Sequence, residues 1–334
     1  DIVHLFEAGN TTISLPNTKF AGYSEHVKGL FGLKGEFQLG PFTITAIASQ
    51  EKGSKESAQF TAGASQREYT IRDYEYVKRK YFYLDKQFRY NTYQPGDSIA
   101  EVSLYVDDQI ESNNLTMGAF EAWAVLEPND IPIATESSES YNGYFHELSV
   151  NEYFVNRLEG WIRLETEIPQ NYVLAAYYIV KHSDGTQDTV GGQWNELPVF
   201  NMIKPQNRTP EMESWEYEWR NVYYLGTRNI DPEGLEVNVF LGPPENGRDV
   251  DSTSGLRYIE LFALDSTGEG YSTQPDGKVD PIRVDFGLGE LFFPVPHPFA
   301  PRSEDIASHP SYSQLPSADQ VPAIYNSTDE TDIR

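Results

Sequence analysis

The chain of 334 residues carries 25 Lys and Arg against 51 Asp and Glu, which gives a formal net charge of −26 at pH 7. Because nucleic-acid phosphates need a basic protein face, this balance excludes a protein that binds nucleic acid broadly. Aromatic residues make up 13% of the chain, too many for a disordered acidic tail, so a packed core is expected.

The sequence contains no cysteine, which excludes disulfides, thiolate zinc sites and cysteine nucleophiles. No stretch approaches the roughly 18 consecutive apolar residues that predict a transmembrane helix. A membrane role would therefore have to be carried by strands. The chain starts at Asp1 and stops at Arg334 abruptly, and we expect it to be a fragment of a longer protein.

The strongest local pattern is an alternation of apolar and polar residues from Phe31 to Ser49. Gly40 and Pro41 interrupt it and predict a tight turn, so residues 30–50 are predicted to form a β-hairpin. Each arm is close to the ~9–11 residues that a tilted strand needs to cross a bilayer core.

Two interpretations of this hairpin compete. In a transmembrane barrel one face contacts lipid and the other faces a watery lumen. The lipid-facing residues would then be Phe31, Leu33, Phe37, Leu39, Phe42 and Ile44, and the lumen-facing residues Lys34, Glu36, Gln38, Thr43 and Thr45. The pattern alone favours the other interpretation, a half-buried hairpin of a soluble sheet, because barrel signals are weak in any single segment.

The run from Tyr74 to Tyr93 is dense in Tyr, Phe, Lys and Arg. Such a mixture can stack on RNA bases. In so acidic a chain we interpret it instead as an amphipathic packing segment whose basic groups offset neighbouring acids.

Beyond residue 98 the pattern is mainly that of strands, with little helix. Strands are predicted at Ile99–Val106, Phe120–Leu126, Trp161–Leu164 and Tyr172–Lys181. The last two flank Pro169 and resemble paired strands, and Ser183–Thr186 predicts a hairpin turn. A short helix is predicted within Pro210–Asn221, and the tail from residue 300 to 334 has the composition of a loop or linker.

The common catalytic motifs are missing, and the six histidines are scattered. The least implausible glycosidase carboxylates are Glu213, Glu216 and Glu218, which alternate with aromatic residues of the kind that line sugar sites. Charged residues flanking a packed tryptophan cluster explain this segment better, so we predict that the chain is not an enzyme.

An acidic loop over residues 265–276 partly matches a twelve-residue calcium loop. The oxygen ligands would come from Asp265, Thr267, Glu269, the carbonyl of Tyr271, Asp276 and, further on, Asp280. The match is imperfect because position twelve is Asp rather than Glu. The alternative is an acidic loop without an ion. Calcium is the only cofactor that the sequence suggests.

Several segments, in chain order, resemble the SprA/Sov family, the giant outer-membrane translocons of the type IX secretion system, also called gliding-motility or cell-surface protein SprA. The clearest is the hairpin from Leu30 to Gly40 and its continuation to Lys52. Others are Tyr81–Leu84 with Phe88 and Arg89, Asn156–Leu164, Arg220–Tyr223 with Gly226, Phe292–Phe299, and Ile324–Thr328. The resemblance spans nearly the whole chain, and the collinear order of these modest motifs carries it.

The resemblance implies antiparallel strands of a large outer-membrane β-barrel plus an inserted β-rich extracellular domain with little helix. Residues 1–52 would supply barrel-wall strands, including the transmembrane hairpin 30–50. Residues 53–323 would form the extracellular cap, and residues 324–334 a linker back to the barrel. The chain would be a non-enzymatic segment of a translocon in the bacterial outer membrane that exports folded cargo, most of it on the extracellular side.

The partners implied by the resemblance are outer-membrane lipid, a plug protein, a small barrel that accepts cargo, and the C-terminal signal domains of the cargo. The alternative function is a soluble extracellular β-sandwich module, an adhesin or glycan binder. Its stacking platforms would come from Trp123, Trp161, Trp215 or Trp219. The side of the hairpin that carries Phe31, Leu33 and Phe37 distinguishes the two, because it lies against lipid in one and under protein in the other.

Overall fold

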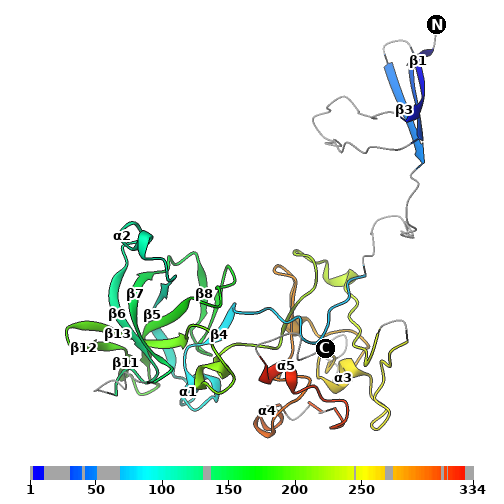
Figure 1. The fold of residues 1–334 in the computed structure, drawn as a ribbon. Coiled ribbons are helices and arrows are strands. Elements are labelled where there is room, and N and C mark those ends of the chain that lie inside the picture. Colours follow the sequence, from blue (N-terminus) through cyan, green and yellow to red (C-terminus); the bar gives the residue numbers. More distant parts are fainter. Residues whose placement is uncertain are drawn as a thin grey trace. The chain divides into compact units, whose positions relative to one another are not determined.

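The fold is seen in a computed structural model that describes residues 3–10, 31–39, 42–50, 68–130, 137–243, 246–267, 274–309, 312–313 and 315–327, the first three ranges as backbone only. The chain divides into two compact units, Asp1–Arg67 and Glu68–Arg334. Four β-sheets and only short helices make the described chain mainly β, as the sequence predicts (Figure 1).

The first unit contains a three-stranded antiparallel sheet of β1 (Val3–Asn10), β2 (Phe31–Leu39) and β3 (Phe42–Gln50), in that order (Figure 1). Leu39 pairs with Phe42, so two residues connect β2 and β3 and the predicted hairpin is confirmed. β1 lies in the range 1–52 that the resemblance assigns to wall strands, although no residue pattern singled it out, and its pairing shifts register between Val3 and Leu5. Such an irregularity interrupts the alternation by which strands are recognised.

The register of the hairpin separates its apolar from its polar positions. Residues directly opposite one another lie on the same face of a sheet. One face holds the pairs Leu33–Ala48, Phe37–Ile44 and Leu39–Phe42, and the other holds Lys34–Ile47, Glu36–Thr45 and Gln38–Thr43. The predicted lipid-facing and lumen-facing positions therefore fall on opposite faces, while what each face contacts remains a prediction.

A seven-stranded sheet dominates the second unit, in the order β11-β10-β5-β7-β6-β13-β12. Its strands are β5 (Ser98–Asp107), β6 (Phe120–Val125), β7 (Ser140–Glu147), β10 (Val173–Lys181), β11 (Gln187–Val190), β12 (Gly192–Trp194) and β13 (Leu197–Lys204). Because β13 also pairs with β10, the strands β10, β5, β7, β6 and β13 form a ring of pairings. The strand predictions over 99–106, 120–126 and 172–181 and the turn at 183–186 are confirmed.

Residues from all five strands of this ring pack into one hydrophobic cluster. It consists of Ala122, Ala124, Phe145, Val173, Ala175, Phe200 and Met202, with Tyr105 among its partly buried neighbours. The ring of Phe200 stacks on that of Tyr105 with centroids 4.0 Å apart, and its centroid lies 5.9 Å from that of Phe145. Large rings beside alanines fill the space because large and small side chains interdigitate.

A smaller sheet packs against the same ring and has the order β4-β9-β8. Its strands are β4 (Tyr81–Tyr83), β8 (Tyr153–Asn156) and β9 (Trp161–Leu164). The predicted pairing of residues 161–164 with 172–181 is wrong, because β9 pairs with β4 and β8 instead. Ile168, in the segment between β9 and β10, is buried in a second hydrophobic cluster, which joins this sheet to the ring of five strands. The segment is therefore packed into the core and is not a tight turn.

The packing interpretation of residues 74–93 agrees with this cluster. Phe82, Leu84 and Phe88 belong to it, and Phe88 lies in the short helix α1 (Lys86–Arg89). The N-terminus of α1 is capped by Asp85, whose carboxylate accepts the amide N–H of Phe88 at 2.8 Å.

The rest of the second unit has a third sheet, in the order β14-β16-β15, and a core of its own. The strands are β14 (Val222–Tyr224), β15 (Val284–Asp285) and β16 (Glu290–Phe292), and the helices are α3 (Tyr258–Leu261), α4 (Ser303–Ser308) and α5 (Ala323–Asn326). The tail is more ordered than its composition predicts. Its residues Tyr312, Leu315, Ile324 and Tyr325 are buried in clusters with the preceding chain.

The other helices of the described residues are no longer than two turns: α2 (Asn114–Met117) and the 3-10 helices η1 (Glu111–Asn113), η2 (Glu213–Tyr217), η3 (Pro232–Gly234) and η5 (Pro281–Arg283). The helix predicted within 210–221 is thus confirmed in the shorter form of η2. Within the ranges that the structure describes, no helix has the length and apolar character needed to cross a membrane.

Candidate functional site

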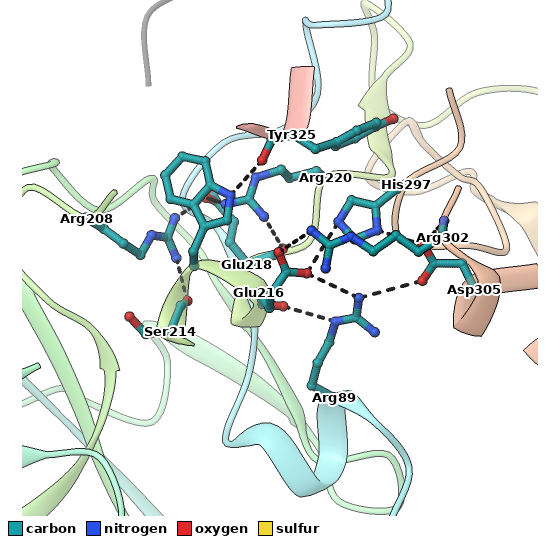
Figure 2. A network of polar contacts seen from close by, with 11 residues as sticks. Arg89, Arg208, Ser214, Glu216, Glu218, Arg220, His297, Arg302, Asp305 and Tyr325 are labelled. Carbon is teal, nitrogen blue, oxygen red and sulfur yellow. Dashed lines mark hydrogen bonds and ion pairs between the residues drawn. The ribbon is translucent and has the colours of Figure 1, made fainter. Parts of the chain in front are cut away.

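Charged side chains that are mostly buried gather where α1, η2 and the chain around α4 meet in the second unit (Figure 2). We call this set the central network. It comprises Arg89, Arg208, Glu216, Glu218, Arg220, His297, Arg302 and Asp305. It contains two of the three carboxylates that the sequence suggested for a glycosidase, so its chemistry decides that possibility.

Glu216 is surrounded by cationic groups. Arg302 Nη2 donates to its Oε1 at 2.8 Å, and its Oε2 lies 3.4 Å from His297 Nε2 and 3.5 Å from Arg89 Nη2. Arg89 also donates through Nε to the backbone carbonyl of Glu216 at 3.1 Å (Figure 2). Burial raises the pKa of this carboxyl, but the hydrogen bonds and positive charges of His297 and Arg302 outweigh burial and lower it.

His297 lies between two carboxylates. Its Nδ1 is 2.8 Å from Asp305 Oδ2, and its Nε2 faces Glu216 (Figure 2). Burial raises the pKa of Asp305, but the hydrogen bond and charge of His297 lower it. The net shift of this pKa is downward. Each imidazole nitrogen therefore faces a carboxylate oxygen, and the ring connects Glu216 to Asp305.

Glu218 compensates two buried guanidinium groups, those of Arg208 and Arg220. The Trp215 ring lies against both, with its centroid 4.2 Å from the Arg220 Cζ and 5.3 Å from the Arg208 Cζ. Burial raises the pKa of Glu218, and the charges of the two arginines lower it by more. Trp215 Nε1 donates to the Tyr325 carbonyl at 2.7 Å, which ties the tail to η2.

The surroundings of Glu216 and Glu218 do not favour an acid and base pair. A glycosidase needs one protonated carboxyl with a raised pKa beside a second carboxylate, whereas the pKa values of Glu216 and Glu218 are both lowered. Glu213 lies apart and accepts from the Tyr217 hydroxyl at 3.2 Å. The geometry therefore suits a brace that fixes α1, η2 and α4 to one another.

The brace should make the second unit sensitive to acid. A carboxyl whose folded pKa lies below its unfolded value stabilises the fold above the unfolded pKa, near 4, and that stabilisation is lost as the pH falls toward the folded value. We therefore expect the free energy of unfolding to fall below about pH 4.5. In Glu216→Gln the slope of this free energy against pH, measured by urea denaturation between pH 5 and 3, should be shallower. An unchanged slope would contradict the brace.

The four tryptophans proposed as stacking platforms lie in different surroundings. Trp161 and Trp219 are partly exposed neighbours with centroids 4.9 Å apart, and Tyr83 lies 5.3 Å from Trp219. Trp123 contacts Trp194 with centroids 5.4 Å apart. Trp215 is buried in the central network and offers no free ring face.

The carboxylates of the predicted calcium loop accept hydrogen bonds from the chain itself. Asp265 accepts the amides of Asp276 and Gly277 at 3.1 and 2.8 Å, and Asp280 accepts the Thr267 hydroxyl at 2.6 Å. Glu269 and Tyr271 lie outside the described residues. Among the residues that are described, no group of three or more His, Asp or Glu could hold a metal ion. The calcium site stays a prediction.

A polar cavity of about 290 Å³ lies beside α1 in the same unit and was not predicted. Asp85, Tyr93, Tyr178 and Tyr217 are among its lining residues. They come from separate segments that the sequence does not bring together. The one residue of this lining that a local sequence signal could have indicated is Asp85, which precedes a short helical run as an N-cap residue does.

Comparison with known proteins finds no relative: no protein-family model matches the chain, and no curated protein matches it.

Proposed function

We propose that the chain is a segment of a protein-conducting translocon of the bacterial outer membrane, which exports folded cargo in type IX secretion and gliding motility. The observation that carries the proposal is the hairpin register, which keeps Leu33 and Phe37 on one face and Glu36 and Gln38 on the other. A strand of nine residues is close to the ~9–11 that span a bilayer core. The resemblance to the SprA/Sov family supports the same role.

In this proposal residues 324–334 link back to the barrel, and residues 53–323 form an extracellular cap without enzymatic activity. Its packed clusters and ion-paired network suit a rigid element that shapes an exit. A chain of net charge −26 repels acidic cargo and so limits adhesion at that exit. The partners are outer-membrane lipid, a plug protein, a small cargo-accepting barrel and the signal domains of the cargo.

The hairpin assignment is testable because the chain has no native cysteine and so no labelling background. Single cysteines at Leu33 and Phe37 should react with a lipid-soluble maleimide and resist a water-soluble one in the source outer membrane. Cysteines at Glu36 and Gln38 should show the reverse, since side chains alternate between faces along a strand. The measurement is the extent of labelling by each reagent in intact membranes.

A cysteine at Leu115, which is 94% exposed in the second unit, is the matched control and should react with the water-soluble reagent. Equal labelling at Leu33 and Glu36 would contradict the membrane assignment. Recovery of the chain as a detergent-free monomer that shields Leu33 and Phe37 would instead support the soluble module.

A glycan-binding module is the second candidate, favoured by the partly exposed cluster around Trp161 and Trp219. Phe154 extends this cluster, with its ring centroid 5.6 Å from that of Trp161 and its side chain exposed. Sugar rings stack on such aromatic faces. Quenching of tryptophan fluorescence by oligosaccharides, lost in Trp161→Ala, is the result that would support this function.

A further inference from the structure

The cavity beside α1 has the size of a site for a small ligand. Its volume of about 290 Å³ is at the lower end of the range for small-molecule pockets. The lining combines the start of α1, the loop that follows β6, and single residues of β10, β11, β13 and η2. Neither the membrane proposal nor the central network uses it.

The carboxylate of Asp85 is the most buried acidic group of this lining, at 9% exposure. Its Oδ1 accepts the Phe88 amide, and its Oδ2 accepts the hydroxyls of Tyr93, at 3.0 Å, and Tyr178. Burial raises the pKa of Asp85, and these hydrogen bonds oppose that effect. Within the described part of the chain, Asp85 forms no ion pair with a Lys, Arg or His.

The neighbouring cation is already engaged elsewhere. Lys86 Nζ lies 2.5 Å from Glu127 Oε1 and 3.5 Å from Glu213 Oε1. Asp130 adds a further carboxylate to the lining. The cavity thus has three acidic residues and one paired lysine, a balance that disfavours an anionic ligand and favours a cationic one.

The residues that line the cavity favour an organic cation over a metal ion. Tyr93, Tyr178 and Tyr217 are among the lining residues, and aromatic side chains attract organic ammonium groups. Calcium would need about six to eight oxygen ligands, and the described residues contain no group of three or more His, Asp or Glu that could hold a metal.

We propose that this cavity binds a primary alkylammonium group, with Asp85 as its counter-ion and the tyrosine rings as its walls. Two sources offer the same chemistry, a lysine side chain of a protein partner and a free diamine. The inference is independent of the membrane proposal, because it concerns residues of the second unit alone.

Calorimetric titration of the full chain tests the site with two probes, 1,5-diaminopentane and Nα-acetyl-lysine amide, and with pentan-1-ol as the uncharged analogue. We expect both amines to bind and the alcohol not to bind. Asp85→Asn should weaken amine binding by at least about tenfold, since a buried charge partner is lost, while Asn remains a good N-cap for α1. Tighter binding of the lysine derivative identifies a protein source, and tighter binding of the diamine a free one.

A second variant covers the case in which Asp85→Asn fails to fold. Gln87 is exposed at the cavity, so Gln87→Trp should block it without disturbing buried contacts and should also weaken binding about tenfold. The matched control is Asp107→Asn, a buried carboxylate that accepts the Tyr141 hydroxyl at 2.9 Å away from the cavity. If pentan-1-ol binds as tightly as the amines, or if Gln87→Trp leaves amine binding unchanged, the proposal is overturned.

Discussion

Replacing Glu218 by glutamine should destabilise the second unit by about 3–5 kcal/mol, because removing one partner of a buried ion cluster leaves uncompensated charge in the interior. The carboxylate lies between Arg208 and Arg220, and its side chain is 4% exposed. The Nε atoms of both arginines are buried without a hydrogen-bond partner among the described residues. Glu218 therefore carries much of their compensation. The measurement is the urea-dependent free energy of unfolding at pH 7.

Two further variants test whether the lost stability comes from uncompensated buried charge. Glu167 pairs with Arg79 at the surface, and Glu167→Gln should change stability by at most about 1 kcal/mol. In the double variant Glu218→Gln with Arg208→Met, one unpaired charge is removed as well, so part of the lost stability should return. If Glu218→Gln costs no more than Glu167→Gln, the central network is not a brace.

The hairpin was predictable because its information is local. Period-two alternation on both sides of Gly40 and Pro41 specifies two strands and a turn, and the register confirms both. The strand over 161–164 was also found, but not its partners. Pairing depends on contacts such as Trp161 with Tyr83 and Asn156, which lie in segments that an alternation pattern does not connect.

The candidate sites were harder to predict than the strands. The sequence drew attention to Glu216 and Glu218 by their position among tryptophans, yet the residues that set their charge state are distant in the chain. His297 and Arg302 lie some eighty residues beyond Glu216, and their positive charges reverse the effect of burial on its pKa. Because a pKa depends on three-dimensional surroundings, the sequence could name the carboxylates but not their protonation.

The tail shows why composition misleads in another direction. Ser, Pro and Asp predict a loop, and most of the described residues of the tail are indeed irregular. A few well-spaced apolar residues nevertheless fix it, since Tyr325 is buried and its hydroxyl accepts the Phe299 amide at 3.0 Å. Burying one large aromatic side chain contributes roughly 2–3 kcal/mol, enough to order a short segment of low intrinsic propensity.

Phe200→Ala should be the most disruptive single change in the ring of strands, with an expected loss of about 3–5 kcal/mol. Its side chain is buried in the cluster shared by all five strands, and its ring stacks on Tyr105 at 4.0 Å. The alanines around it cannot extend to fill the space, so the transfer free energy and the cavity both contribute. Phe154→Ala, at an exposed side chain, should cost about 1 kcal/mol or less.

The measurement for both variants is the free energy of unfolding in urea, followed by near-ultraviolet circular dichroism, which reports aromatic packing. Since Phe200 belongs to β13, which closes the ring by pairing with β10, its loss should weaken that closure first. Amides of residues 201–204 should then exchange with deuterium faster than those of β5, because local opening precedes global unfolding. Uniform acceleration across the ring would mean that the β10 and β13 pairing is no weaker than the others, and the ring would have to be treated as one cooperative unit.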